Sequence, residues 1–290
     1  MERSYIMPRL CFILTFALTL FSVVLRSLCM VFYFDVDPGY FTADLMPVLS
    51  NVLYFVAITI ALVCVSLTPK DSLSSELHTR LRAPVAIILG LSLAAFTVIS
   101  FIICFPSRQS KLMIAPTLLG LFAAIYFLLS AKRNGRYPDR LSFLGYLPVL
   151  WSIGAIGEIY FDNYTTMNSP IKTSLLFALL GFMFIMLAEL RFRVNQPMPR
   201  YSVFMLSVGG FTTLTGSIPV LVATGAGKLD HIRHLLYAAV LLFAGLYGFY
   251  LLFRYTLFPS DVPDETTDEP TEAVEESNTT ISETVAPNAE

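Results

Sequence analysis

Charged residues are scarce in this 290-residue chain, where Asp, Glu, Lys and Arg together make up 14% of the sequence. Soluble domains are about one quarter charged. Hydrophobic residues make up 56%, and the mean hydropathy is +0.69. A soluble core of this length cannot bury so much apolar surface, so the surplus is expected to face lipid. The composition excludes an ordinary soluble domain and indicates an integral membrane protein.

Cysteine is also rare, and catalytic signatures are missing. The four cysteines, Cys11, Cys29, Cys64 and Cys104, lie in apolar runs without a CxxC spacing. Buried free cysteine behaves as a small hydrophobe, so we expect neither a disulfide nor a metal site. The chain has no nucleophile elbow, HExxH, P-loop, GxGxxG or kinase motif. The sequence therefore predicts no catalytic residue, no cofactor and no nucleic-acid partner, and it favours a protein that is not an enzyme.

Basic residues are absent from the C-terminal stretch. From Pro259 to Glu290 the chain has ten acids and no Lys or Arg, with many Pro, Thr and Ser residues. Such a segment cannot bury enough surface to offset its ordering entropy. We predict a transmembrane helical domain over 1–257 and a disordered acidic cytoplasmic tail over 258–290. The tail either docks a cytoplasmic protein or is a solvated end.

Eight apolar runs are long enough to cross a bilayer, which takes about 20 residues each. They are predicted at 9–33, 45–67, 83–105, 112–131, 142–161, 171–192, 201–224 and 233–256. The first lacks a small-residue cleavage site and is interpreted as an uncleaved helix. The predicted fold is an all-α integral membrane protein of about eight transmembrane helices.

The Lys and Arg residues in the loops and at the ends of the apolar runs predict the orientation. With the N-terminus inside, the inner segments hold 13 of them and the outer segments hold five. Basic residues concentrate on the cytoplasmic side, where they also contact anionic lipid. We therefore predict a multi-pass protein of the cell membrane with both termini cytoplasmic and the lipid bilayer as its partner.

A tripeptide motif that occurs twice in the sequence suggests an internal repeat. Tyr33-Phe34-Asp35 ends the first apolar run, and Tyr160-Phe161-Asp162 ends the fifth. Similar loops and spans follow each of them in the same order. One hypothesis is two parallel four-helix repeats related by an axis along the membrane normal, as in some transporters. The alternative is that aromatic residues followed by Asp mark any membrane interface.

Acidic residues gather at the predicted outer side. The stretch FYFDVDPGYF, residues 32–41, places Asp35 and Asp37 just beyond an aromatic belt. With Asp44 and Asp162 they are interpreted as an outer acidic mouth that attracts cations. The alternative is a solvated turn at the proline–glycine pair. The DVD sequence has too few ligands for a calcium loop, so no metal is predicted.

Ionisable residues inside a span are functional candidates. Arg26 lies in the first run, and it either extends to the outer interface or has a buried partner. Glu158 lies near the end of the fifth run, and the repeat hypothesis makes it a partner for Arg26. Glu189 and Arg193 are four residues apart on one helix face and are interpreted as a structural ion pair.

The most polar run in any span is GGFTTLTGSIP, residues 209–219. Small residues let helices pack closely, which is the favoured interpretation. The alternative is a broken helix at a binding site, where hydroxyl groups and free backbone contact a solute. The candidate hydroxyls belong to Thr212, Thr213, Thr215 and Ser217. His231 and His234, at the start of the eighth run, suggest a rim that senses pH or binds anions more than a metal site.

The pieces YFD, DPGYF and AELRFRVNQPMPRY resemble a group of uncharacterised polytopic membrane proteins of bacteria. The resemblance covers most of the membrane body but not the tail. It implies a bacterial inner-membrane protein, and it assigns no activity and no functional residue.

Two functions follow from the sequence. The first is a small-solute or ion carrier, in which Arg26 and Glu158 set charge selectivity and the 209–219 run supplies ligands. The second is a non-catalytic scaffold or envelope sensor that docks a cytoplasmic partner through its tail. A carrier needs its intramembrane charges to face a water-filled cavity, whereas a scaffold needs them paired or extended to the interface.

Overall fold

The computed structural model describes residues 3–42, 44–68, 82–104, 114–132, 143–162, 165–166, 168–193, 198–229 and 231–257. The chain divides into one unit over Met1–Ser260 and a second over Asp261–Glu290. The second unit lies outside the described residues, so the disordered tail stays a prediction. The side chains of Cys104 and Arg193 also lie outside them.

Helices dominate the described part of the chain. They are α1 (Arg3–Phe32), α2 (Leu45–Leu67), α3 (Arg82–Cys104), α4 (Ile114–Lys132), α5 (Tyr146–Tyr160), α6 (Pro170–Arg193), α7 (Pro199–Gly225) and α8 (Ile232–Leu257). Eight segments are long and apolar enough to span a membrane, that of α5 reaching back to Phe143. This confirms the all-α membrane fold, and each predicted span agrees with a helix to within a few residues.

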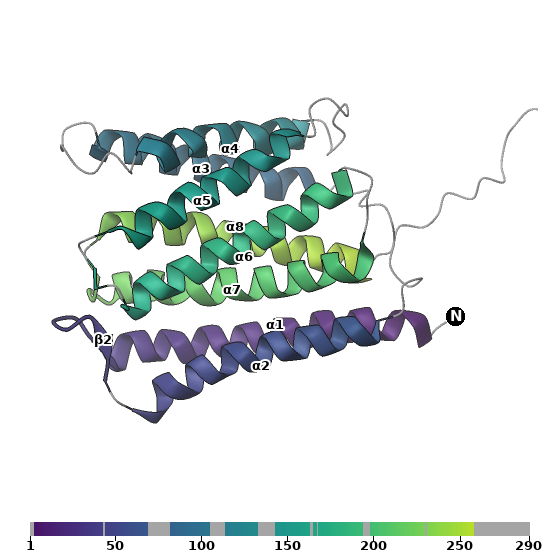
Figure 1. Cartoon of the computed structure of the whole chain (residues 1–290), viewed down its shortest axis with the longest axis horizontal. Helices are drawn as coiled ribbons and strands as arrows, with labels where there is room; N and C mark the ends of the chain where they lie inside the picture. The colour runs from purple at the N-terminus through teal and green to yellow at the C-terminus, as the bar shows by residue number, and fades with distance from the viewer. Residues whose placement is uncertain are drawn as a thin grey trace, which may run out of the picture. The chain divides into compact units, whose positions relative to one another are not determined.

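The helices pack in an order that differs from their order in the chain (Figure 1). α7 lies in the middle of the packing, in contact with α6, α8, α1 and α2. α3 packs on α4 and α8, while α5 packs on α4 and α6. α1 and α2 keep wide apolar faces exposed, as expected for helices in contact with lipid, whereas most of α7 is buried.

Successive helices run in opposite directions, so their ends gather at two ends of the bundle. A short hairpin joins α1 to α2 at one of them, which we call the hairpin end; α5 finishes there and α6 and α8 begin there (Figure 1). α1 begins and α8 finishes at the opposite end. An even number of spans therefore places the first and last helical residues on one side of a membrane, and which side faces the cytoplasm stays a prediction.

The hairpin consists of β1 (Phe34–Asp35) and β2 (Tyr40–Phe41), paired antiparallel. Gly39 has a φ of 74°, a left-handed conformation that glycine adopts without steric cost. Asp35 accepts a hydrogen bond from the backbone N–H of Asp37 at 3.2 Å, and both side chains are exposed. These two aspartates therefore stabilise a solvated turn.

The 209–219 run lies inside the continuous helix α7, so the broken-helix interpretation is wrong. Its glycines serve close packing instead. A Cβ added at Gly209 would lie 2.7 Å from the carbonyl oxygen of Gly181 in α6, and one at Gly216 would collide with the carbonyl of Ser174. Small residues thus bring the backbones of α6 and α7 together, as the favoured interpretation predicted.

The two halves of the chain are not packed alike. α6 and α7 form the most extensive helix pair, whereas α2 and α3, at the corresponding place in the first half, are not closely packed. α1–α2 lies against α7, and α3–α4 lies against α5 and α8. The helix packing gives no support to two equivalent four-helix units, and the repeat stays a hypothesis about sequence.

Three cysteines can be placed in the fold. Cys11, Cys29 and Cys64 are buried and free. Cys11 lies with its sulfur 3.8 Å from the hydroxyl of Ser207 in α7. The prediction that these cysteines behave as small buried side chains is confirmed for the three.

Candidate functional site

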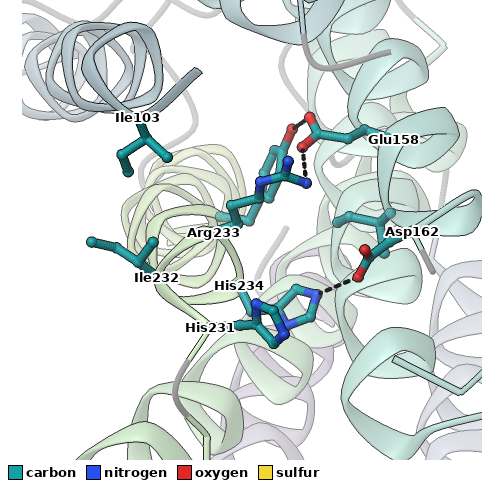
Figure 2. A pocket seen from close by; sticks show the side chains of 9 residues that line it. Ile103, Glu158, Asp162, His231, Ile232, Arg233 and His234 are labelled. Atoms are coloured by element: carbon teal, nitrogen blue, oxygen red, sulfur yellow. Dashed lines mark hydrogen bonds and ion pairs between the residues drawn. The ribbon is translucent and has the colours of Figure 1, made fainter. Parts of the chain in front are cut away.

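A pocket opens at the hairpin end between the last turn of α5 and the first turn of α8, with α3 beside it (Figure 2). Its volume is about 120 Å³. Its lining residues are Ile103, Glu158, Ile159, Asp162, His231, Ile232, Arg233, His234 and Tyr237. We call it the α5–α8 pocket. Both acids come from the end of α5, and the histidines and the arginine come from the start of α8.

Helical spacing explains why these side chains meet. Glu158 lies in the last turn of α5, and Asp162 follows just after the C-cap residue of that helix, so both are held near its end. His234 and Tyr237 are three residues apart on α8, and Arg233 lies four residues before Tyr237. Each helix therefore presents its polar side chains in one short stripe toward the other.

Glu158 is a buried acid of the pocket, and 8% of its side chain is exposed, as is 8% of that of Asp162. One carboxylate oxygen accepts a hydrogen bond of 2.5 Å from the hydroxyl of Tyr237, and the other lies 3.4 Å from Nη1 of Arg233. Tyr237 is held by ring contacts with Phe96 and Trp151. The carboxylate thus has one short hydrogen bond to a fixed ring and a longer contact with a flexible side chain.

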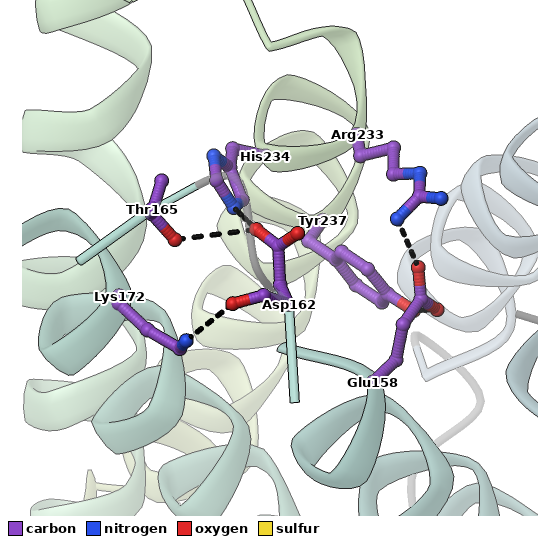
Figure 3. A network of polar contacts seen from close by, with 7 residues as sticks. All are labelled: Glu158, Asp162, Thr165, Lys172, Arg233, His234 and Tyr237. Carbon is purple, nitrogen blue, oxygen red and sulfur yellow. Dashed lines mark hydrogen bonds and ion pairs between the residues drawn. The ribbon is translucent and has the colours of Figure 1, made fainter. Parts of the chain in front are cut away.

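Asp162 forms the second bridge to α8 (Figure 3). Its Oδ2 lies 3.6 Å from Nε2 of His234, a contact that is an ion pair only while the imidazole is protonated. The same oxygen accepts a hydrogen bond of 3.2 Å from the hydroxyl of Thr165. Its backbone carbonyl accepts one of 2.8 Å from Nζ of Lys172. Asp162 therefore connects α8 to the α5–α6 loop and to the start of α6.

The two bridges cross a gap in the helix packing. Within the described helices, α5 packs on α4 and α6 and α8 packs on α3, α6, α7 and α1, but α5 and α8 are not closely packed against each other. Glu158–Arg233 and Asp162–His234 span the space between them. The arrangement is chemically a pair of interhelical charge contacts at a small cavity whose wall also includes isoleucines.

A second polar cluster surrounds Arg26, which is 4% exposed. Its Nη2 and Nε donate to the hydroxyl of Ser174 at 3.0 and 3.3 Å, and its Nη1 donates to the amide oxygen of Asn51 at 3.4 Å. The guanidinium carbon lies 4.8 Å from the ring centre of Tyr54. Extension of Arg26 to the interface is therefore wrong, and so is its pairing with Glu158, which instead contacts α8.

The predicted hydroxyl ligands of α7 are used within the fold. Thr212, Thr213 and Thr215 donate to carbonyls one turn earlier in their own helix. The hydroxyl of Thr215 also lies 2.8 Å from that of Tyr54, which ties it to the cluster around Arg26. Ser217 is buried and has no hydrogen-bond partner among the described residues. None of the four lines the α5–α8 pocket.

The predicted acidic mouth is divided between two places. Asp35 and Asp37 belong to the exposed hairpin turn, whereas Asp162 turns toward His234 in the α5–α8 pocket. Within the described ranges, no three His, Cys, Asp or Glu side chains are placed to hold a metal ion.

Arg233, Lys172 and Tyr237 are site residues to which the sequence assigned no role in a site. Arg233 and Lys172 are two of the five basic residues assigned to the outer segments, yet Lys172 is 1% exposed at the start of α6. Tyr237 was hidden among many aromatic residues. The available signal was the accumulation of acids at the end of the fifth run and of bases at the start of the eighth, both predicted at the outer interface.

A third buried acid lies far along α6 from the pocket. Glu189 accepts hydrogen bonds from the hydroxyls of Tyr126 at 2.9 Å and Tyr247 at 2.8 Å. Its expected partner Arg193 has a side chain outside the described residues, so that ion pair stays a prediction. The two tyrosines show that Glu189 helps to join α4, α6 and α8.

The fold and these buried polar groups define a polytopic membrane protein of eight membrane-spanning helices with a charged pocket near one end. No family model, no curated protein and no solved structure matches the chain. The resemblance drawn from short motifs therefore stays a prediction, and the function has to be inferred from the site itself.

Proposed function

We propose that the protein is a carrier for a small charged solute and that the α5–α8 pocket is where the solute enters the bundle. The observation that carries this proposal is the pair of charge contacts across the gap between α5 and α8. Helices joined only by long side chains can separate at a lower cost than helices packed backbone to backbone. Charge contacts of this kind suit a gate that opens when a solute replaces one partner.

The lining favours a solute with charges of both signs. Glu158 offers a carboxylate to an ammonium group, and Arg233 offers a guanidinium to a carboxylate. A small zwitterion would satisfy both side chains once it separates them. A volume of about 120 Å³ is well below the range of about 300–1,000 Å³ that is usual for ligand pockets, so the pocket excludes large solutes unless it widens. We therefore infer a solute of the size and charge of a small amino acid.

The test is a thermal-shift and uptake experiment on the purified full-length protein. Small zwitterions, simple cations and simple anions are compared on the wild type, Glu158→Gln and Arg233→Gln, with Asp37→Asn in the exposed turn as the matched control. A ligand at roughly 100 times its dissociation constant stabilises the folded state by about 2.7 kcal/mol. We expect a zwitterion to stabilise the wild type and the control but neither pocket variant, and to be taken up by proteoliposomes.

Two other results would count against the carrier. If no solute shifts the wild type while both pocket variants lose stability, the contacts are structural and the scaffold is favoured. If a zwitterion binds but is not taken up, the protein is a receptor and not a carrier. The scaffold itself depends on the tail, which lies outside the described residues and stays a prediction.

A further inference from the structure

The cluster around Arg26 lies apart from the α5–α8 pocket, and its charge is not compensated. Among the described residues, no carboxylate lies within ion-pair distance of the guanidinium, whose partners are the neutral side chains of Ser174, Asn51 and Tyr54. A buried charge without a counter-ion is strongly disfavoured in a membrane interior. The fold holds a positive charge that lacks its negative partner.

The hydrogen bonds of Arg26 are also incomplete. A guanidinium carries five N–H groups in one plane. Arg26 makes three hydrogen bonds, two of them to the single hydroxyl oxygen of Ser174. The Tyr54 ring covers one face of the guanidinium and does not use these donors. Two N–H groups therefore remain available to a ligand that approaches in the guanidinium plane, which is the geometry of carboxylate and phosphate recognition.

Two buried hydroxyl groups on α1 and α2 lack partners as well. Ser22 and Ser50 are 0% and 1% exposed, and neither hydroxyl has a hydrogen-bond partner among the described residues. Ser22 lies one turn before Arg26 on α1, and Ser50 lies one turn before Tyr54 on α2, so both occupy the helix faces that meet at the guanidinium. Buried polar groups are normally hydrogen-bonded. Unused hydroxyl donors on two helices thus lie one turn from Arg26 and from Tyr54, the residue that covers its guanidinium.

We infer that Arg26 is the cation of a binding site for one monovalent anionic group, with Ser22 and Ser50 as additional donors. Arg26 lies six residues before the end of α1, about 9 Å along the helix from the hairpin end. Asn51 is exposed beside it on α2, and it marks the side from which the group arrives. The anionic group belongs either to a small soluble anion or to the headgroup of an anionic lipid.

The experiment compares the stability of the wild type and Arg26→Gln in two arms. In the first arm, protein in neutral phosphatidylcholine nanodiscs is titrated with acetate, chloride and phosphate. In the second arm, protein in nanodiscs with phosphatidylglycerol is compared with protein in nanodiscs without it. The buffer contains one weakly binding anion at a fixed concentration. Lys228→Gln, which removes a cation outside both the Arg26 cluster and the α5–α8 pocket, is the matched control in both arms.

We expect an anion in one arm to raise the thermal midpoint of the wild type and of Lys228→Gln but not that of Arg26→Gln. Without that anion, Arg26→Gln should be at least as stable as the wild type, because the uncompensated charge is gone. A purely structural arginine would behave differently: Arg26→Gln would then be less stable by the same amount under every condition. That result, or a wild type that responds to no anion and no anionic lipid, would overturn the inference.

A milder variant keeps the proposal testable if Arg26→Gln does not fold. Ser50→Ala removes one proposed donor and leaves the charge in place. A hydrogen bond to a charged group contributes about 1.5–3 kcal/mol, so Ser50→Ala should weaken anion affinity about tenfold or more. An unchanged affinity in both Ser50→Ala and Ser22→Ala would remove the hydroxyls from the site and contradict the inference.

Discussion

The hydroxyl of Tyr237 lies 2.5 Å from a carboxylate oxygen of Glu158 and links α8 to α5 from inside the bundle. The other oxygen of Glu158 contacts Arg233 at the longer distance of 3.4 Å. The short hydrogen bond holds the carboxylate in position, while the longer contact is the one that a solute would replace in the proposed carrier. Glu158 therefore has two partners of unequal distance on the same helix.

Removing the hydroxyl of Tyr237 tests its structural role. Tyr237→Phe keeps the ring contacts with Phe96 and Trp151 and leaves Glu158 without its short hydrogen bond. We expect the free energy of unfolding in detergent to fall by about 1.5–3 kcal/mol, the range for a hydrogen bond to a charged group. The matched control is Tyr255→Phe on the same helix, because the buried hydroxyl of Tyr255 has no partner among the described residues. Equal losses in both variants would contradict the assignment.

A double-mutant cycle measures the contact between Glu158 and Arg233. The single variants Glu158→Gln and Arg233→Gln and their combination give the coupling free energy from chemical unfolding. We expect a favourable coupling of about 0.5–3 kcal/mol, as for neighbouring groups in one polar network. Losses that simply add would mean that the two side chains do not interact in the folded protein.

Cysteine labelling reports whether the α5–α8 pocket opens to water. In a variant with the four native cysteines replaced by alanine, Ile159→Cys places a thiol on the pocket wall. We expect a membrane-impermeant maleimide to label it and a bound solute to slow that labelling. Ile153→Cys, on an exposed apolar face of α5, should be reached only by a membrane-permeant reagent. If the impermeant reagent labels both cysteines at equal rates, Ile159 does not line a water-filled pocket that is separate from the lipid-facing surface at Ile153.

The close approach of α6 and α7 leaves no room for one methyl group. In Gly216→Ala the new Cβ would collide with the backbone carbonyl of Ser174, so the helices must move apart. Overpacking of this kind costs about 1–3 kcal/mol, which should appear as a lower thermal midpoint in detergent. Gly225→Ala is the matched control on the same helix, since a Cβ there meets nothing within 4 Å. A stable Gly216→Ala would show that small residues are not needed in the 209–219 run.

The spans could be predicted from the sequence because apolar length is a local property. α2 begins and ends at the predicted residues, and the other helices differ by a few positions. The partner of Glu158 could not be predicted in the same way. It depends on which helices are neighbours, and neither hydropathy nor a repeated tripeptide encodes that order.

Arg26 also shows which features the sequence could predict and which it could not. Its position inside a span was visible in the sequence and marked it as a functional candidate. Whether it extended to the interface or was buried depended on α6, whose Ser174 reaches it from 148 positions along the chain. The prediction that small residues let α7 pack closely is confirmed. It could be made from the sequence because two backbones approach closely wherever glycine lies at the contact, whichever helix is the partner.

The central place of α7 has a consequence for biogenesis. α5 and α7 are the least apolar of the eight spans, and one flank of α7 is covered by α8, where Gly210 meets Phe249 and Leu214 meets Gly245. Because α8 follows α7 in the chain, α8 can cover that flank only after it has itself been synthesised. The same helix brings Arg233, His234 and Tyr237 to the pocket. Insertion of α8 therefore completes the core and creates the pocket in one step, so a chain stalled before α8 has neither.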